Sequence, residues 1–152
     1  MNVLKFVIKH YSLHLIPVWC IAGPLGWFGQ DISIPIFATL FTVIIDADHL
    51  VDYLLYPERR GFNLREALGC AYFLSAPRIY LPLHSYDLHI AVTALLLWWG
   101  YTSFALSWLV GFVVHIVTDE VLGHSTGNVR LRNVLLYRLV NRFDRRLYDK
   151  SL

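Results

Sequence analysis

Three carboxylates and an imidazole interrupt an apolar run that begins near Ile32, and this stretch constrains the fold more than any other. The four side chains are Asp46, Asp48, His49 and Asp52. Taking a charge out of water costs free energy unless a partner offsets it. Ionisable side chains within an apolar helix therefore usually face a partner or a wet cavity, and they indicate a functional site.

The composition around this stretch is that of a membrane protein. The 152 residues, enough for one domain, are 57% hydrophobic and 16% charged, whereas soluble domains are about 25% charged. Residues 130–150 hold seven basic and two acidic side chains, a net of +5 within a total of +2, so the rest of the chain sums to −3. Such a tail favours anionic lipid headgroups over nucleic acid, so we expect membrane lipids as partners and no nucleic acid.

The apolar segments predict an all-α integral membrane bundle of about four spans. The spans are expected at residues 11–29, 35–56, 86–99 and 104–122. Pro17 and Pro24 should break or kink the first helix, because proline removes a backbone donor.

Two further helices are predicted outside the spans. Asn63 followed by Glu66 resembles a capping box, which predicts a short interfacial helix through Leu74. From Leu131 the apolar residues recur at helical spacing between arginines, which predicts a basic amphipathic helix. We therefore divide the chain into a transmembrane metal-site domain, residues 1–128, and a tail helix, residues 129–152.

The basic residues also predict an orientation. Lys5 and Lys9, the loop at Arg59 and the tail must share one side of the membrane. The positive-inside rule then predicts a multi-pass inner-membrane protein with both termini in the cytoplasm. On this topology the histidines and carboxylates of the spans, including His10 near the interface, all lie at one depth near the cytoplasmic face.

Carboxylates and neutral imidazoles from several helices are ligands for Zn²⁺ or a similar divalent ion. His115 and Asp119 are four residues apart on one helical face, and Asp46 and His49 are three apart. We predict one or two ions, Zn²⁺ first with Mn²⁺ or Mg²⁺ as alternatives. The candidate ligands are His14, Asp46, Asp48, His49, His84, His115 and Asp119. Asp48 and Asp52 are also the candidates for a general base.

These residues resemble the membrane-bound metal-dependent hydrolase family, also described as LexA-binding inner-membrane hydrolases. The matching pieces are His14, the box Asp46-Ala47-Asp48-His49, the pair His84-Ser85, and His115 with Asp119 and Gly123. The family usually has threonine where this chain has Leu83, and a His-Arg-Gly stretch where it has Arg78-Ile79-Tyr80. The family is distantly similar to all-helical zinc phospholipases C and P1-type nucleases, which implies a phosphoester substrate.

The sequence therefore predicts a metal-dependent phosphoester hydrolase, whose substrate could be lipid-linked and reach the site sideways from the leaflet. Arg59 and Arg78 are candidates for binding its phosphate. Two other functions stay open: a metal-ion or proton transporter, and a membrane docking protein without enzymatic activity. Residues 23–29, 34–40 and 95–107 contain no acid, base or histidine, which disfavours a conduction path across the whole membrane.

Overall fold

A computed structural model describes residues 3–56, 61–68, 72, 76–121 and 133–144. Within these ranges the chain is helical, and its one strand-like contact is a backbone bridge between Arg78 and Asp144. The all-α prediction is confirmed for these residues. The helices are α1 (Val3–Phe28), α2 (Ser33–Ile45), α3 (Ala47–Leu55), α4 (Leu64–Leu68), the 3-10 helix η2 (Pro82–His84), α5 (Tyr86–Trp98), α6 (Thr102–Val121) and α8 (Leu135–Val140).

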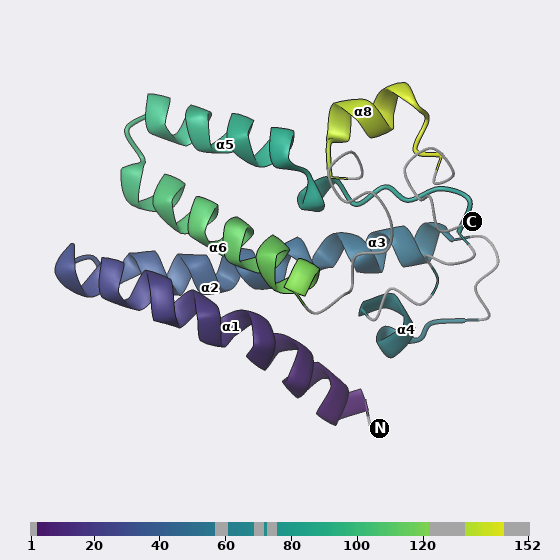
Figure 1. The fold of residues 1–152 in the computed structure, drawn as a ribbon, viewed down its shortest axis with the longest axis horizontal. Helices are drawn as coiled ribbons and strands as arrows, with labels where there is room; N and C mark the ends of the chain where they lie inside the picture. Colours follow the sequence, from purple (N-terminus) through teal and green to yellow (C-terminus); the bar gives the residue numbers. More distant parts are fainter. Residues whose placement is uncertain (1–2, 57–60, 69–71, 73–75, 122–132, 145–152) are drawn as a thin grey trace.

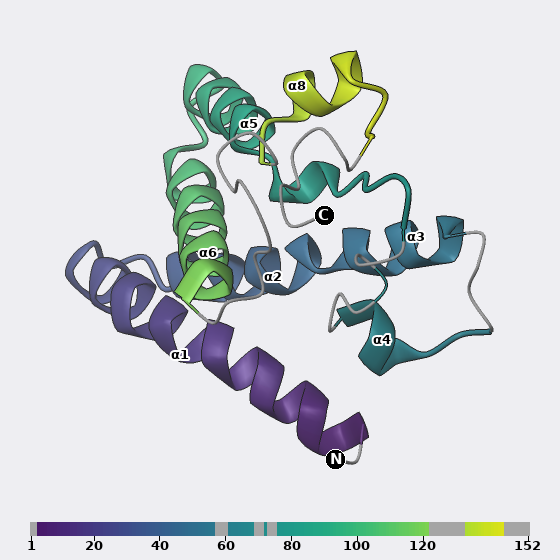
Figure 2. The ribbon, with the colours of Figure 1, turned by 45° about the vertical axis from the view of Figure 1, so that its right-hand side comes forward.

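Helices α1, α2, α5 and α6 form a layered bundle with both of its tight turns at one end (Figure 1). The α1–α2 turn and the α5–α6 turn are joined there, because Ser103 donates a hydrogen bond to Asp31. The hydroxyls of Ser103 and Ser33 hold the pKa of Asp31 below its usual value. Helices α3, α4 and α8 lie toward the opposite end (Figures 1 and 2).

Among the described residues, two helical stretches are long and apolar enough to cross a membrane. They are Ser33–Leu55, which combines α2 and α3, and Thr102–Val121, which is α6; Tyr86–Trp98 is apolar but shorter. The four predicted spans stay a prediction.

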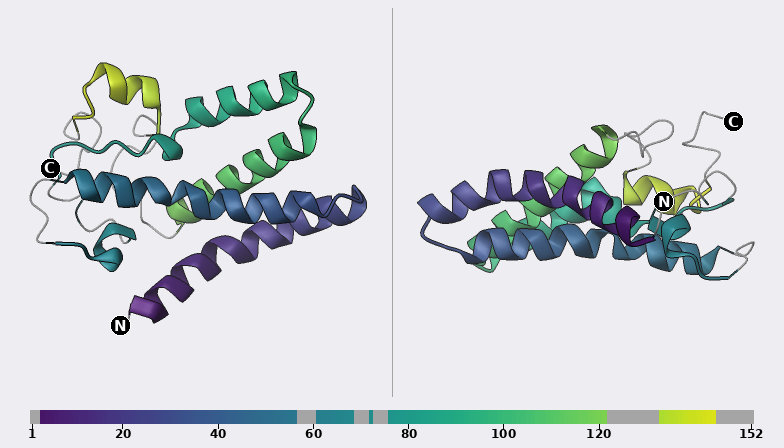
Figure 3. Two further views of the ribbon diagram at one scale, coloured as in Figure 1. Left: turned by 180° about the vertical axis from the view of Figure 1, so that it is seen from behind. Right: turned by 90° about the horizontal axis from the view of Figure 1, so that it is seen from below.

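The predicted second helix is divided in two at Asp46, the residue between α2 and α3. The two helices nevertheless run nearly in line, as both views in Figure 3 show. Of the predicted break or kink in the first helix, a break is wrong, since α1 continues through both Pro17 and Pro24.

The two short helices are only partly as predicted. Asn63 Oδ1 accepts the backbone amides of Arg65 and Glu66, at 3.1 and 3.3 Å, so the cap of α4 is confirmed. Glu66 does not close the capping box, because its carboxylate accepts the Tyr53 hydroxyl instead. Residues 69–71 and 73–75, where that helix was expected to continue, lie outside the described residues. The tail helix is shorter than predicted: it covers Leu135–Val140, and the described residues on either side of it, 133–134 and 141–144, are not helical. Residues 129–132 and 145–152 lie outside the described residues.

Close packing of α2 on α6 depends on a glycine. A Cβ at Gly111 would lie 2.8 Å from the backbone oxygen of Ala38 and 3.2 Å from Thr42 Oγ1. Thr42 also donates to the carbonyls of Ala38 and Gly111, at 2.8 and 3.2 Å. This close approach sets the separation between α2, which is followed by Asp46, and α6, which carries the predicted ligands His115 and Asp119.

Replacing Gly111 by alanine should therefore push α2 and α6 apart and lower the thermal unfolding temperature in detergent. Overpacking of this kind costs about 1–3 kcal/mol. Gly23→Ala is the matched control, because its Cβ would meet only Trp19, at 3.8 Å. The control should be neutral or stabilising by up to about 1 kcal/mol, since alanine favours helix over glycine. Equal behaviour of the two variants would contradict close packing at Gly111.

Candidate metal centre

Six histidine and aspartate side chains from four separate segments converge inside the bundle. They are His14 of α1, Asp46 and His49 at the α2–α3 junction, His84 of η2, and His115 and Asp119 of α6. Five of them are nearly inaccessible, with side chains at most 7% exposed, whereas Asp119 is 17% exposed. The cluster is therefore buried with one partly open edge at Asp119.

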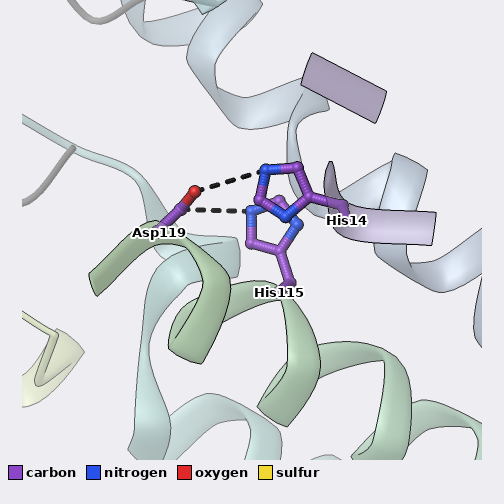
Figure 4. Close-up of side chains that lie close together, drawn as sticks. All are labelled: His14, His115 and Asp119. Carbon is purple, nitrogen blue, oxygen red and sulfur yellow. Dashed lines mark ion pairs between the residues drawn. The ribbon is translucent and has the colours of Figure 1, made fainter. Parts of the chain in front are cut away.

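The first half of the cluster joins α1 to the end of α6. Nε2 of His14 lies 3.4 Å from Oδ1 of Asp119, and Nε2 of His115 lies 3.3 Å from Oδ2 (Figure 4). The two imidazoles stack with their centroids 4.5 Å apart. Among the described residues neither ring nitrogen of His14 has a hydrogen-bond partner. A fully buried imidazole without such a partner needs another source of stabilisation.

The second half joins the α2–α3 junction to η2 and shares atoms with the first. Nε2 of His84 lies 3.2 Å from Nε2 of both His49 and His115. Oδ1 of Asp46 lies 3.4 Å from Nε2 of His115 and 3.9 Å from Nε2 of His49. Oδ2 of Asp119 lies 3.6 Å from Nε2 of His84. The two halves are therefore one continuous set of nitrogen and oxygen atoms.

These spacings fit the ligands of a bound ion. Two ligand atoms about 2.1 Å from one ion are separated by about 3.0 Å in octahedral and about 3.4 Å in tetrahedral geometry. Two groups satisfy the spacing for a metal: His14 with His115 and Asp119, and Asp46 with His49 and His84. Six donors exceed what one tetrahedral ion needs, so the cluster could hold one or two ions.

Two further residues support the ligands from behind. Nδ1 of His84 donates to Oδ2 of Asp48 at 3.2 Å, and the backbone amide of Leu83 donates to the same oxygen at 2.7 Å. Because Nδ1 of His84 carries the proton, Nε2 is the nitrogen that can bind a metal. Similarly, Nε2 of His10 donates to Oδ2 of Asp46 at 3.0 Å, which leaves Oδ1 toward the cluster.

The electrostatic environment of His84 favours a cation. Burial disfavours the charged imidazolium, but the carboxylates of Asp48 and Asp119 outweigh this and raise the pKa of His84 to about 10. The same two carboxylates would also favour a divalent ion at Nε2 of His84, which would take the place of a proton there, because imidazole binds metals only in its neutral form.

Arg138 of α8 holds the segment that carries His84. Arg138 of α8 is 1% exposed and donates to the carbonyls of Tyr80 and Leu81 and to the Ser85 hydroxyl. Leu81 itself has a positive φ of 34°, which costs a non-glycine residue free energy. The structure thus takes Arg138 out of the basic surface predicted for the tail.

Two side chains of α5, Asp87 and His89, also hold this region together. Asp87 accepts the backbone amides of Leu135 and Leu136, both at 2.8 Å, and so ties α5 to the start of α8. His89 donates from Nε2 to the carbonyl of Leu83 at 2.7 Å. Ser85 occupies the N-cap position of α5, but its side chain makes no capping hydrogen bond.

The remaining predicted site residues lie elsewhere. Asp52 accepts the Tyr72 hydroxyl and the Tyr80 amide, both at 3.0 Å, and does not belong to either group of potential metal ligands. Asp52 and Arg78 line a separate pocket of about 390 Å³ with Tyr56. Arg59 lies outside the described residues.

The roles of His10 and Arg138 were not predicted from the sequence. His10 was expected at the interface, yet it is 7% exposed and bonded to Asp46. Its spacing of four residues from His14 was the available signal, because residues four apart share a helical face. No local pattern distinguishes Arg138 from the other arginines of the tail.

Replacing Asp48 by asparagine should weaken metal binding without removing a ligand. The amide oxygen of asparagine is a weaker acceptor for the hydrogen bond from Nδ1 of His84 than a carboxylate is, so Nε2 becomes a poorer ligand for a metal. Loss of such a partner typically costs about 10- to 100-fold in metal affinity. Competition with a chromophoric chelator measures this, with Asp31→Asn at the far end of the bundle as the control. Unchanged affinity in Asp48→Asn would exclude the supporting role.

Comparisons with known proteins add no assignment. No protein-family model matches the chain, and no curated protein or solved structure matches it. The fold and the cluster define the class of the described part of the chain: it is helical, two of its helices could cross a membrane, and its buried histidine and aspartate groups could hold a metal ion.

Proposed function

We propose that this protein is a membrane-embedded hydrolase that uses a divalent ion, Zn²⁺ first, to cleave a phosphoester. The observation that carries the proposal is the convergence of six metal-binding side chains within an apolar helical bundle, with one carboxylate at an open edge. Burying so many ionisable groups is costly unless a cation or a proton offsets their charge. The resemblance to membrane-bound metal-dependent hydrolases supports a phosphoester as the substrate.

In this proposal the residues of the cluster bind the metal, and their neighbours orient them. The six converging side chains would hold one or two ions, while Asp48 and His10 orient His84 and Asp46. Asp119 lies at the edge where a substrate can approach. When bound, an ion would lower the pKa of a water ligand to about 7, so that hydroxide would be available at neutral pH. In the hydrolysis the water oxygen bonds to phosphorus, the ester P–O bond breaks, and a proton from the water ends on the leaving oxygen.

The placement in the membrane is part of this proposal. The two apolar helices α2–α3 and α6 support insertion by length and composition. The distribution of basic residues favours a four-span protein of the inner membrane with both termini in the cytoplasm. On that topology the proposed centre faces the cytoplasmic leaflet.

The test is metal-dependent hydrolysis by detergent-purified protein. Treatment with a chelator should abolish cleavage of p-nitrophenyl phosphate and bis(p-nitrophenyl) phosphate, and added Zn²⁺, Mn²⁺ or Mg²⁺ should restore it. Asp119→Asn should remain inactive after metal is added, whereas Asp31→Asn should retain wild-type activity. Protein that holds stoichiometric metal but hydrolyses neither ester nor any phospholipid or nucleotide would refute the proposal.

A further inference from the structure

An apolar groove lies between α1 and α6, the two helices that carry His14, His115 and Asp119. Its volume is about 400 Å³, within the size range of small-molecule sites. It is lined by Leu13, Pro17 and Ile21 from α1 and by Val113, Val114, Val117, Thr118 and Val121 from α6. Thr118 is the one polar residue among them. Water in such a groove would find few hydrogen-bond partners.

The groove and the centre are built from the same turns of the same two helices. Leu13 precedes His14, and Val114 precedes His115. Thr118 precedes Asp119, the candidate ligand with the most exposed side chain. The open edge of the centre and the apolar groove therefore lie on the same pair of helices, which meet at His14, His115 and Asp119 in Figure 4.

This arrangement suits one kind of substrate. A small soluble phosphoester has no apolar part to occupy the groove, whereas a lipid phosphate has both a charged group for the centre and a chain for the groove. We propose that the α1–α6 groove binds the hydrocarbon chain of a phosphorylated lipid whose phosphoester lies at the metal centre. The inference rests on the proposed function and specifies its substrate class.

Photolabelling tests the groove directly and does not depend on turnover. The metal-loaded protein in phosphatidylcholine vesicles is labelled with hexadecyl phosphate that carries a diazirine in its chain, and the labelled peptides are mapped by mass spectrometry. Labels should concentrate on the groove segments of α1 and α6. Unlabelled hexadecyl phosphate should halve the labelling at a mole fraction about tenfold lower than hexadecanol needs. Butyl phosphate should compete poorly, because it has little apolar surface to bury.

Variants that fill the groove provide the matched comparison. Val117→Trp and Val113→Trp should each reduce labelling about fivefold or more, because indole fills most of the space that a chain would occupy. Val43→Trp, at an exposed valine of α2 outside the groove, should label like wild type. Metal content, measured on every variant, should remain at the wild-type level.

Three results would overturn the inference. Equal competition by hexadecanol would show that the groove holds bulk membrane lipid. Equal competition by butyl phosphate would show that the chain is not bound. Labelling that is unchanged in both groove variants would place the chain elsewhere. A wild-type protein without metal would instead refute the proposed function, so the two failures are distinguishable.

Discussion

Purified wild-type protein should contain at least one divalent ion per chain, and Asp46→Ala and His115→Ala should have lost most of it. Oδ1 of Asp46 and Nε2 of His115 lie 3.4 Å apart, and each of these side chains contacts both halves of the cluster. Affinity should therefore fall by more than the roughly 10- to 100-fold that loss of a supporting partner costs. Elemental analysis after detergent purification measures the metal content.

The control for this experiment is Asp31→Ala, which changes a carboxylate at the opposite end of the bundle. Asp31 bonds to Ser33 and Ser103 and has no contact with the cluster in the described structure. It should leave metal content at the wild-type level. Metal-free wild-type protein, or wild-type metal content in both Asp46→Ala and His115→Ala, would rule out the centre.

Replacing Arg138 by glutamine should weaken metal binding through His84, although Arg138 is not a ligand. The substitution removes the donors to Tyr80, Leu81 and Ser85, on the segment that carries His84. A buried acceptor left without its donor costs about 1–3 kcal/mol. We expect a lower unfolding temperature and a loss of metal affinity of about 10- to 100-fold, similar to that for other supporting partners.

A double-mutant cycle separates positioning of His84 from general destabilisation. If Arg138 acts through His84, then Arg138→Gln added to His84→Ala should cause little further loss of metal affinity. Additive losses would contradict that route. Arg142→Gln is the matched control, because Arg142 is an exposed arginine on the same segment. It should leave both the unfolding temperature and the affinity unchanged.

The part of the site that sequence could predict consists of residues close together along one helix. His115 with Asp119, and Asp46 with His49, were predicted from their spacing, and the structure brings both pairs into the cluster. His14 and His84 were also predicted as ligands, and both lie within the two groups that could hold a metal. Ionisable residues in apolar helices can be recognised from the sequence, because the free-energy cost of burying them usually indicates a functional site.

The division of roles among neighbouring residues could not be predicted in the same way. Asp48 and Asp52 are four apart and were equal candidates for a general base. In the structure Asp48 accepts a hydrogen bond from Nδ1 of His84, while Asp52 accepts hydrogen bonds from the Tyr72 hydroxyl and the Tyr80 amide. Their partners are 20 to 36 residues away along the chain, and helical periodicity contains no information about such distant contacts.

The sequence by itself determined the helical class and the set of metal-binding residue types. Local hydrophobic patterning and i, i+3 or i, i+4 spacing are sufficient for these, because they depend on the geometry of a single helix. Only the tertiary structure decided that α1 continues through its prolines, that His10 supports Asp46, and that Arg138 is buried against the His84 segment. Each of these depends on the packing between segments far apart in sequence, where the free energy of burial outweighs local preference.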